Sequence, residues 1–257
     1  TQSQWEDPTN GFNNHASNNS WMWALTTSSE NIGNLHNFFA HSAQEAEYGY
    51  TPLSMPAVLS SFFDRVSDAD FRKHSWIDPK REYAYKSCYP DAAAFVESLR
   101  DYSALKIRPG GGGYDDYAVG NTGEVNMMRM EEMKFIIAEC DARNGDASSL
   151  IDIVKTRNEA YTCTKTGSEL IKEMFLQKRI EFWGEGIMFF DYKRCPEYLT
   201  INRGYPGTNH PEMARFNVDG IAPWFNVPIN GYEAQDNKAL SETNNPDPSD
   251  SILPWVE

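Results

Sequence analysis

Apolar residues recur at helical spacing through residues 166–194, and this pattern constrains the fold more than any other feature of the chain. Two rows lie on adjacent faces: Leu176, Ile180, Trp183, Ile187 and Phe190 in one, and Phe175, Phe182 and Phe189 in the other. A helix with two adjacent apolar faces is covered on much of its circumference. The pattern therefore predicts a long buried helix, with Thr166 and Glu169 at the spacing of a capping box at its start.

Two glycines interrupt this helical pattern. Gly184 and Gly186 flank Glu185, and each glycine costs a helix about 1 kcal/mol relative to alanine. We interpret them as positions where another backbone comes close, with the surrounding aromatic side chains filling the remaining volume. Burial of several aromatic side chains, ~1.5–3 kcal/mol each, exceeds the cost of the two glycines.

A pair of helices is predicted before this segment. The first runs near residues 127–143, and its apolar stripe consists of Met130, Met133, Ile137 and Cys140. Asn144 and Gly145 stop it, and Asp146 can cap a second helix near residues 147–160. A helix, a tight break and a second helix form an αα-hairpin, the unit from which helical repeats are built.

The rest of the chain contains mostly loop signals. Residues 21–25 (WMWAL) read as a short strand with Trp21 and Trp23 on one face, which we expect to pack inward. Residues 107–117 contain four consecutive glycines, but the Lys-Ser/Thr that closes a phosphate-binding loop is missing, which favours a flexible surface loop. No segment has the composition of an interdomain linker. We expect one mainly α-helical domain over 1–257, with a loop-rich segment (1–124), a helical core (125–195) and a loop-rich closure (196–257).

Charge and composition exclude several classes of partner and cofactor. The formal net charge is −14, which argues against nucleic acid and against electrostatic docking on anionic lipid. No apolar run approaches the ~18–20 residues that span a bilayer. The four cysteines (Cys88, Cys140, Cys163 and Cys195) and the five histidines lack metal-site spacing. We expect no metal and no cofactor, and isolated thiols rather than a disulfide, which stays possible.

Three ordered motifs resemble one family. Residues 177–194 (QKRIEFWGEGIMFFDYKR) are similar to the pattern E-R-R-x-E-L-x-x-E-G-x-R-x-x-D-x-x-R of SusD/RagB-like proteins, the nutrient-binding outer-membrane lipoproteins of Bacteroidetes. The matching positions are Arg179, Glu181, Glu185, Gly186, Asp191 and Arg194. Gln177 and Lys178 replace the first Glu and Arg, and Met188 stands where a second Arg is usual, which removes one internal salt bridge expected from the family.

Two further stretches follow the same family pattern. Residues 128–146 match its R-x-x-E-x-x-x-x-x-A-E-A-x-x-x-x-G-D hairpin at Arg129, Glu132, Ala138, Glu139, Gly145 and Asp146. Pro228, Glu233, Asn237 and Leu240 resemble its closing P-x-x-E-x-x-x-N-x-x-L, with two residues inserted after the proline. The matches span about residues 128–240.

The resemblance implies a fold, a location and a function. It implies tetratricopeptide-like helical pairs on one side, a ligand-binding side of long loops, little β-structure, and an N-terminal half outside this chain that carries a lipid anchor. Members lie on the outward-facing surface of the outer membrane, where they cap a SusC-like TonB-dependent transporter and capture oligosaccharides, or in some branches peptides. The resemblance thus implies a binding protein and no enzyme.

Flat apolar rings with polar neighbours are the side chains that bind sugars, because a pyranose stacks its C–H face on an aromatic ring. The polar stretch 26–54 is long for a connection and is rich in such residues. The candidate carbohydrate-binding residues are Asn34, His36, Phe38, Phe39, His41, Tyr48, Tyr50 and, in a later turn, Trp76. For each aromatic residue alone, a core role is an equal alternative.

Two other functions compete with glycan binding. The αα-hairpin also suits a helical-repeat module whose ligand is another protein. A pair of carboxylates among Glu181, Glu185 and Asp191 could catalyse glycoside hydrolysis. However, Glu181 and Glu185 share one helix face near Lys178, Arg179 and Arg194, and we interpret them as structural ion pairs.

Overall fold

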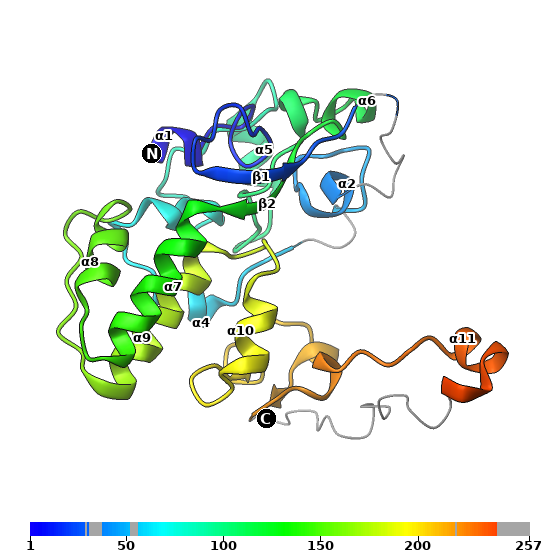
Figure 1. Cartoon of the computed structure of the whole chain (residues 1–257). Helices are drawn as coiled ribbons and strands as arrows, with labels where there is room; N and C mark the ends of the chain where they lie inside the picture. Colours follow the sequence, from blue (N-terminus) through cyan, green and yellow to red (C-terminus); the bar gives the residue numbers. More distant parts are fainter. Residues whose placement is uncertain (29, 31–37, 52–55, 219, 241–257) are drawn as a thin grey trace. The chain divides into compact units, whose positions relative to one another are not determined.

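The computed structural model describes residues 1–28, 30, 38–51, 56–218 and 220–240. Its helices are α1 (Gln2–Trp5), α2 (Phe38–Ser42), α4 (Ser60–Phe63), α5 (Ala92–Ser98), α6 (Tyr117–Gly120), α7 (Met130–Arg143), α8 (Ser148–Lys155), α9 (Gly167–Glu181), α10 (Met188–Arg194) and α11 (Gly231–Asp236). Its strands are β1 (Trp21–Leu25), β2 (Val125–Arg129), β3 (Ile201–Asn202) and β4 (Asn217–Val218). Short 3₁₀ turns include η1 (Phe71–Ser75) and η2 (Gly110–Gly112). The predicted mainly α-helical class is confirmed (Figure 1).

The chain divides into two compact units, Thr1–Glu185 and Gly186–Glu257. In the first unit, α7 contacts both α8 and α9, and β1 pairs with β2 (Figure 1). In the second unit, β3 pairs antiparallel with β4, and the Phe225 ring meets the edge of Phe189 at 5.0 Å between ring centroids. The αα-hairpin exists as predicted, and its stacking as a tetratricopeptide repeat stays a prediction.

The predicted long helix is shorter than the sequence pattern. α9 is buried along most of its length, as expected, but it ends at Glu181, and α10 begins only at Met188. Thr166 occupies the N-cap position, yet its side chain makes no capping hydrogen bond. The helix boundary at Thr166 is therefore right, and the capping box is wrong.

Gly184 and Gly186 end the helix instead of admitting a second backbone. Their φ angles are +80° and +81°, in the left-handed region that residues with a Cβ rarely adopt. A Cβ added at either glycine would meet no described atom within 4 Å. Our interpretation of a close backbone approach is therefore wrong. The glycines make the turn that separates α9 from α10 and places Glu185 outside the helix.

The α7–α8 hairpin buries a different face from the predicted one. Phe135, Ala138 and Ala142 of α7 are buried, whereas Met130, Ile137 and Cys140 of the predicted stripe are exposed. Asp146 does help to start α8, because its Oδ1 accepts a hydrogen bond of 2.8 Å from the backbone N–H of Ser148.

Register shifts in the β1–β2 sheet separate the two tryptophans of β1. Trp21 pairs with Arg129 and Trp23 with Met128, so β1 has one residue more than β2 over this step. Such a bulge changes the face to which the following side chains point. Trp21 is 5% exposed and Trp23 is 59% exposed, so the inward packing predicted for both is wrong for Trp23.

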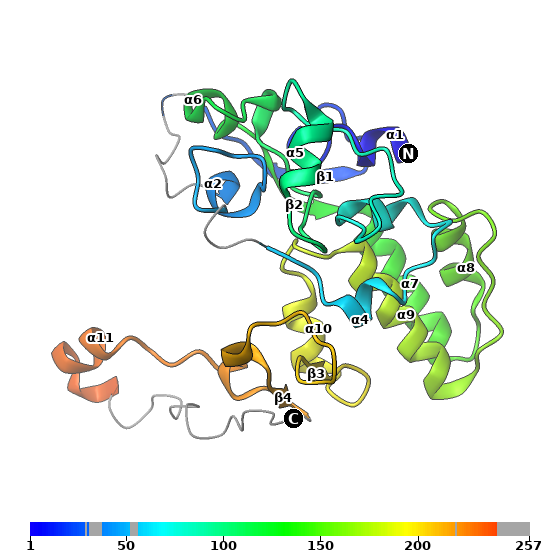
Figure 2. The ribbon, with the colours of Figure 1, turned by 180° about the vertical axis from the view of Figure 1, so that it is seen from behind.

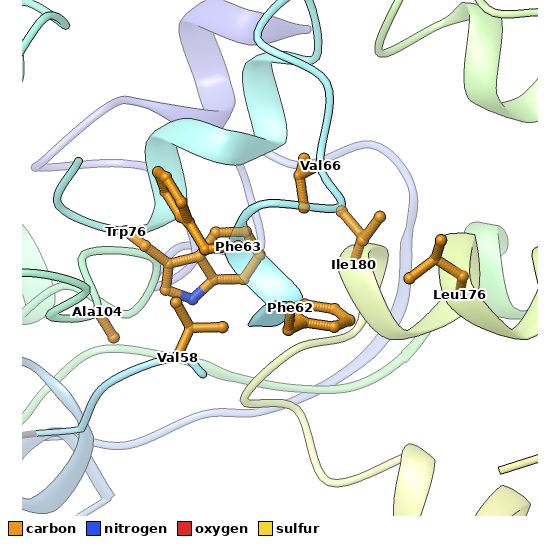
Figure 3. Close-up of a cluster of buried hydrophobic side chains, with 8 residues drawn as sticks. All are labelled: Val58, Phe62, Phe63, Val66, Trp76, Ala104, Leu176 and Ile180. Carbon is orange, nitrogen blue, oxygen red and sulfur yellow. The ribbon is translucent and has the colours of Figure 1, made fainter. Parts of the chain in front are cut away.

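Two of the hydrophobic clusters in the described part of the first unit contain predicted site residues. One joins α4 and α9 around Trp76 and consists of Val58, Phe62, Phe63, Val66, Trp76, Ala104, Leu176 and Ile180 (Figure 3). The other lies beneath β1 and α2 and consists of Trp5, Phe12, Trp21, Phe39, Ala43, Ala46 and Ile107. Through Phe39, Ala43 and Ala46, the second cluster packs part of the predicted loop against the strand.

The four-glycine segment is packed, contrary to the predicted flexible loop. Gly110 is buried, and a Cβ there would lie 2.3 Å from the backbone nitrogen of Gly123. The segment forms η2, which contacts α6. Its glycines therefore allow two backbones to come close at this point.

The described residues contain neither a cluster of side chains that could hold a metal ion nor a helix long and apolar enough to cross a membrane. All four cysteines lie in the described residues, none forms a disulfide, and Cys195 is the buried one.

Candidate functional site

The tempting catalytic pair, Glu181 and Glu185, lies inside a buried charge cluster. Glu181 comes from the last turn of α9, and its side chain is fully buried. Its carboxylate lies 2.7 Å from Arg129 at the end of β2, 3.1 Å from Arg157 after α8, and 3.2 Å from Arg72 in η1. Three segments far apart in the sequence therefore converge on one carboxylate.

Glu185 is held by a second set of partners. The Arg129 guanidinium donates to both of its oxygens at 2.9 Å, and Asn126 donates to Oε2 at 3.0 Å. The Lys106 ammonium also contacts Glu185, and it donates to the backbone carbonyls of Glu181 at 2.6 Å and Trp183 at 3.0 Å. The turn made by the glycines thus lets Glu185 bind Arg129 and Lys106.

The electrostatics of this cluster oppose acid catalysis. Burial alone would raise the pKa of Glu181, but the Arg129, Arg157 and Arg72 cations hold it well below its ordinary value of 4.5. The pKa of Glu185 is lowered in the same way by Arg129 and Lys106. Burial in turn lowers the pKa of Lys106 to about 8. A glycosidase needs one carboxyl group with a raised pKa and access to substrate, and this pair has neither.

The structural interpretation of these carboxylates is right, but the partners differ from those predicted. Lys178, Arg179 and Arg194 were expected near Glu181 and Glu185. Arg179 instead places its guanidinium 4.4 Å from the centroid of the Phe62 ring, and Arg194 pairs with Asp191 at 2.7 Å within α10. The two carboxylates are not on one helix face, because the helix ends between them.

Two of the predicted carbohydrate-binding residues are core residues. Trp76 and Phe39 are both 0% exposed. The Trp76 ring meets the rings of Phe62 and Phe63 edge-on (Figure 3). It meets the Trp183 ring in the same way. Neither Trp76 nor Phe39 presents a ring face to a ligand. Asn34 and His36 lie outside the described residues.

The remaining candidates lie together on α2 and the segment that follows it. His41 is exposed and stacks on Tyr50, with ring centroids 5.0 Å apart and an interplanar angle of 12°. The backbone N–H of Tyr50 donates to the Ala40 carbonyl at 2.7 Å, which fixes the segment against α2. Phe38, at the start of α2, is partly exposed.

Tyr48, the last of the remaining candidates, is half-buried. Its half-buried side chain lies against Gly120, where an added Cβ would come within 2.1 Å of the phenol oxygen. That oxygen is buried with no hydrogen-bond partner among the described residues, and burial raises the pKa of the phenol. Tyr48 is therefore placed to position the segment 47–50.

Sequence reasoning missed a second group of aromatic rings beside this segment. Tyr89 stacks on Phe95 with 4.0 Å between ring centroids, and the Tyr114 ring lies 4.3 Å from it at a tilt of 35°. The backbone N–H of Glu47 donates to the Tyr114 carbonyl at 2.9 Å. Tyr114 follows the glycine run directly, so an aromatic residue next to a turn was the available signal.

We call Phe38, His41, Tyr50, Tyr89 and Tyr114 the aromatic surface. Each of its rings is at least partly exposed. Residues 47–50 link the two groups of rings, because Glu47 is hydrogen-bonded to Tyr114 and Tyr50 stacks on His41. Glu47 and Tyr50 are three residues apart, a span of at most about 10 Å. The helices α2 and α6 lie near each other in both views of this part of the first unit (Figures 1 and 2). The surface is aromatic, and the exposed carboxylates of Glu47 and Asp115 lie beside Tyr114.

The fold and the site together define a mainly α-helical protein. Its core contains buried ion pairs, and its loops present an aromatic surface. The SusD family model matches residues 80–250, more than half of the chain. The chain therefore belongs to the SusD family, and the resemblance inferred from its three motifs is confirmed.

Solved structures support the same fold. The structure is similar to a SusD-like carbohydrate binding protein from Bacteroides vulgatus, with a TM-score of 0.62 and 21% identity over 96% of this chain and 52% of that one. It is also similar to a SusD superfamily protein from Bacteroides fragilis, with a TM-score of 0.50 and 14% identity over 95% and 54%. The chain spans about half the length of these proteins. No curated protein has significant sequence similarity to it.

Proposed function

We propose that the protein binds oligosaccharides or polysaccharides without cleaving them and delivers them to a SusC-like TonB-dependent transporter of the outer membrane. Family membership supports the proposal, and the B. vulgatus protein of similar fold is described as carbohydrate binding. The proposed location is the outward-facing surface of the outer membrane, with a lipid anchor outside this chain. We also propose that residues 1–257 form the C-terminal part of one SusD-like domain.

The His41–Tyr50 stack, with His41 exposed and Tyr50 half-buried, is the observation that carries the glycan proposal. A stacked pair is rigid, so a sugar ring that packs on it loses little further conformational freedom of the protein. Tyr114 and Tyr89 extend the aromatic surface, and the Glu47 carboxylate can accept hydrogen bonds from sugar hydroxyls. This combination of an apolar platform and polar neighbours matches the two faces of a pyranose.

Affinity electrophoresis of the full-length protein against plant, host and microbial polysaccharides tests this proposal. We expect one class of polysaccharide to retard the protein, with no release of reducing ends. Retardation should weaken in Tyr50→Ala and persist in Glu159→Ala, which changes an exposed residue remote in sequence from the aromatic surface. Release of reducing ends would contradict the non-catalytic part of the proposal.

Peptide capture is the alternative for the same surface, because aromatic rings also bind peptide side chains. Isothermal titration calorimetry separates glycan binding from peptide binding. The ligands are oligosaccharides of the polysaccharide that retards the protein, and peptide mixtures. Binding of peptides alone would overturn the glycan proposal and keep the site. Binding of neither ligand, by a folded full-length protein, would leave the αα-hairpin as the functional part and favour a protein-interaction module.

A further inference from the structure

One buried carboxylate joins the segments that carry the aromatic surface. It belongs to Glu45, which follows α2 and is 0% exposed. Its Oε2 accepts a hydrogen bond of 2.6 Å from Nη1 of Arg108, which is also buried. This ion pair therefore links the segment after α2 to the segment that precedes η2.

The other oxygen of the same carboxylate holds a third segment. Oε1 of Glu45 accepts hydrogen bonds from the Ser87 hydroxyl and, at 2.8 Å, from the backbone N–H of Cys88. The Ser87 oxygen in turn accepts a hydrogen bond of 3.1 Å from the backbone N–H of Tyr89. One hydroxyl thus connects the buried carboxylate to Tyr89 of the aromatic surface.

Each of these three segments continues within a few residues to a ring of the aromatic surface. The pairs of anchored residue and ring are Glu45 with Tyr50, Cys88 with Tyr89, and Arg108 with Tyr114. Loops hold site residues less precisely than helices and strands do, so a site on loops depends on the contacts that support it. The three ring-bearing segments share one such contact, the Glu45 carboxylate.

Stability alone is a weak explanation for this buried pair. Desolvation offsets much of the attraction between two buried charges, and apolar residues of similar volume often stabilise a fold as well. An ion pair differs from apolar packing in its geometry, because the donors must meet the carboxylate oxygens at short distances and suitable angles. The place of the Glu45–Arg108 pair, where three ring-bearing segments meet, favours a positioning role.

We propose that Glu45 is a positioning residue of the aromatic surface, where it fixes Tyr50, Tyr89 and Tyr114 relative to one another without contacting the ligand. Its effect on the rings is independent of what the protein binds. Its effect on affinity rests on the proposed glycan-binding function, since a sugar ring must meet all parts of its platform at once.

Glu45→Gln removes this anchor with little change in side-chain volume. The glutamine amide has one acceptor oxygen and one N–H₂ donor. The N–H₂ group must face either the Arg108 cation or the backbone N–H of Cys88, and neither can accept a hydrogen bond. One segment is therefore released from the other two in either orientation.

Fluorine NMR of the full-length protein tests the positioning without any ligand. Fluorotyrosine is placed at Tyr50 or at Tyr89, and its signal is compared between the otherwise unchanged protein and Glu45→Gln. We expect the signals at both positions to shift or split, because the ring environments change when the segments separate.

Glu173→Gln is the matched control. Glu173 is buried in α9 and accepts hydrogen bonds from three donors, as Glu45 does. Helix α9 lies away from α2 in both views of the first unit (Figures 1 and 2). We expect the fluorine signals to stay unchanged in this variant. The donors to Glu173 are Lys165, Tyr161 and Gln177.

Glycan affinity is measured in the same two variants, at a temperature where circular dichroism shows both to be folded. The ligand is the polysaccharide that retards the wild type. We expect Glu45→Gln to weaken binding about fivefold or more, the equivalent of at least one lost aromatic contact. Affinity in Glu173→Gln should stay within about twofold of the wild type, because distant sites contribute independently.

Unchanged fluorine signals in Glu45→Gln would overturn the proposal. Equal shifts in Glu173→Gln would also overturn it, because general loosening of the fold would then be the cause. If Glu45→Gln does not fold, Ser87→Ala replaces it, since only a neutral hydroxyl is lost. This variant should shift the signal at Tyr89 and leave that at Tyr50, and an unmoved Tyr89 signal would overturn the proposal equally.

Failure of the proposed function gives a different result. A folded wild type that binds no glycan, with fluorine signals that still shift in Glu45→Gln, would support the positioning role and overturn glycan binding. Shifted signals with unchanged glycan affinity would overturn the claim that the anchored rings form the binding platform.

Discussion

Glu181 and Arg129 form a buried ion pair with 2.7 Å between Oε1 and Nη1, and the pair joins the end of α9 to the end of β2. The two side chains are 0% and 2% exposed. Arg129 also pairs with Glu185 within the glycine turn, and its guanidinium lies 4.2 Å from the centroid of the Phe182 ring. One arginine thus ties together the sheet, the last turn of α9 and the residues that follow it.

Removal of the Glu181 charge should destabilise the full-length protein strongly. In Glu181→Gln, the Arg72, Arg129 and Arg157 cations lose the carboxylate that they share, and an uncompensated buried charge costs about 3–5 kcal/mol. Urea denaturation followed by circular dichroism measures the loss. The matched control is Glu169→Gln, whose exposed pair with Lys172 is expected to contribute nothing measurable. A loss for Glu181→Gln no larger than for the control would contradict the structural role.

Acid should weaken the fold through the same carboxylates. The pKa values of Glu181 and Glu185 are lowered from 4.5 in the folded state. A carboxyl group of this kind stabilises the fold at pH values above its unfolded pKa, and the stabilisation is lost as pH falls through the folded pKa. We expect this contribution to be constant above about pH 5.5 and to decline below pH 4.5.

Denaturant midpoints of the wild type and Glu185→Gln, measured from pH 7 to pH 3, isolate one of these groups. The variant should be less stable at pH 7, and the difference from the wild type should shrink as the pH falls, because protonation removes the same charge. A difference that stays constant over this range would show that folding does not lower the pKa of Glu185.

The long-range partners in this cluster also show what the sequence could not reveal. The sequence pattern correctly indicated a buried α9, the α7–α8 hairpin that precedes it, and ion pairing of Glu181 and Glu185. It could not identify Arg72 or Arg157 as partners, because spacing along one helix gives only i+3 and i+4 neighbours. Loop segments bring these arginines in through tertiary packing.

The two apolar stripes of α7 illustrate a second limit. Met130, Met133, Ile137 and Cys140 form a good stripe, but Phe135, Ala138 and Ala142 form another. Periodicity shows that a face is apolar and does not show which neighbour covers it. The same limit applies to Trp76, which a turn-rich sequence suggested as a ligand residue and which packing places in the core.

Two glycines with different roles should respond oppositely to asparagine. At Gly184, where φ is +80° and a Cβ meets no described atom, alanine should cost about 1–2 kcal/mol and asparagine less, because asparagine tolerates the left-handed region. At Gly110, a Cβ would lie 2.3 Å from the Gly123 nitrogen. Overpacking there should cost at least ~1–3 kcal/mol, and the larger asparagine should cost more than alanine.

Thermal denaturation of the four variants Gly184→Ala, Gly184→Asn, Gly110→Ala and Gly110→Asn measures this difference. The order of alanine and asparagine at each position is the result that matters, since it does not depend on the absolute stability. The same order at both positions would mean that backbone conformation and close approach are not the separate causes assigned here.

Substitutions at Tyr50 and Trp76 should separate ligand binding from stability. Tyr50→Ala removes the half-buried ring of the His41–Tyr50 stack. It should weaken glycan binding about fivefold, since an aromatic contact contributes ~0.5–1.5 kcal/mol. Tyr50→Phe keeps the ring and should retain most of the affinity.

Trp76→Ala opens a cavity in a cluster where the ring is fully buried, and it should lower the free energy of unfolding by about 3–5 kcal/mol. At a temperature where the Trp76 variant is still folded, it should bind glycan as the wild type does. Loss of binding in folded Trp76→Ala with full binding in Tyr50→Ala would move the site from the aromatic surface to the core cluster, because only residues near Trp76 would then control the affinity.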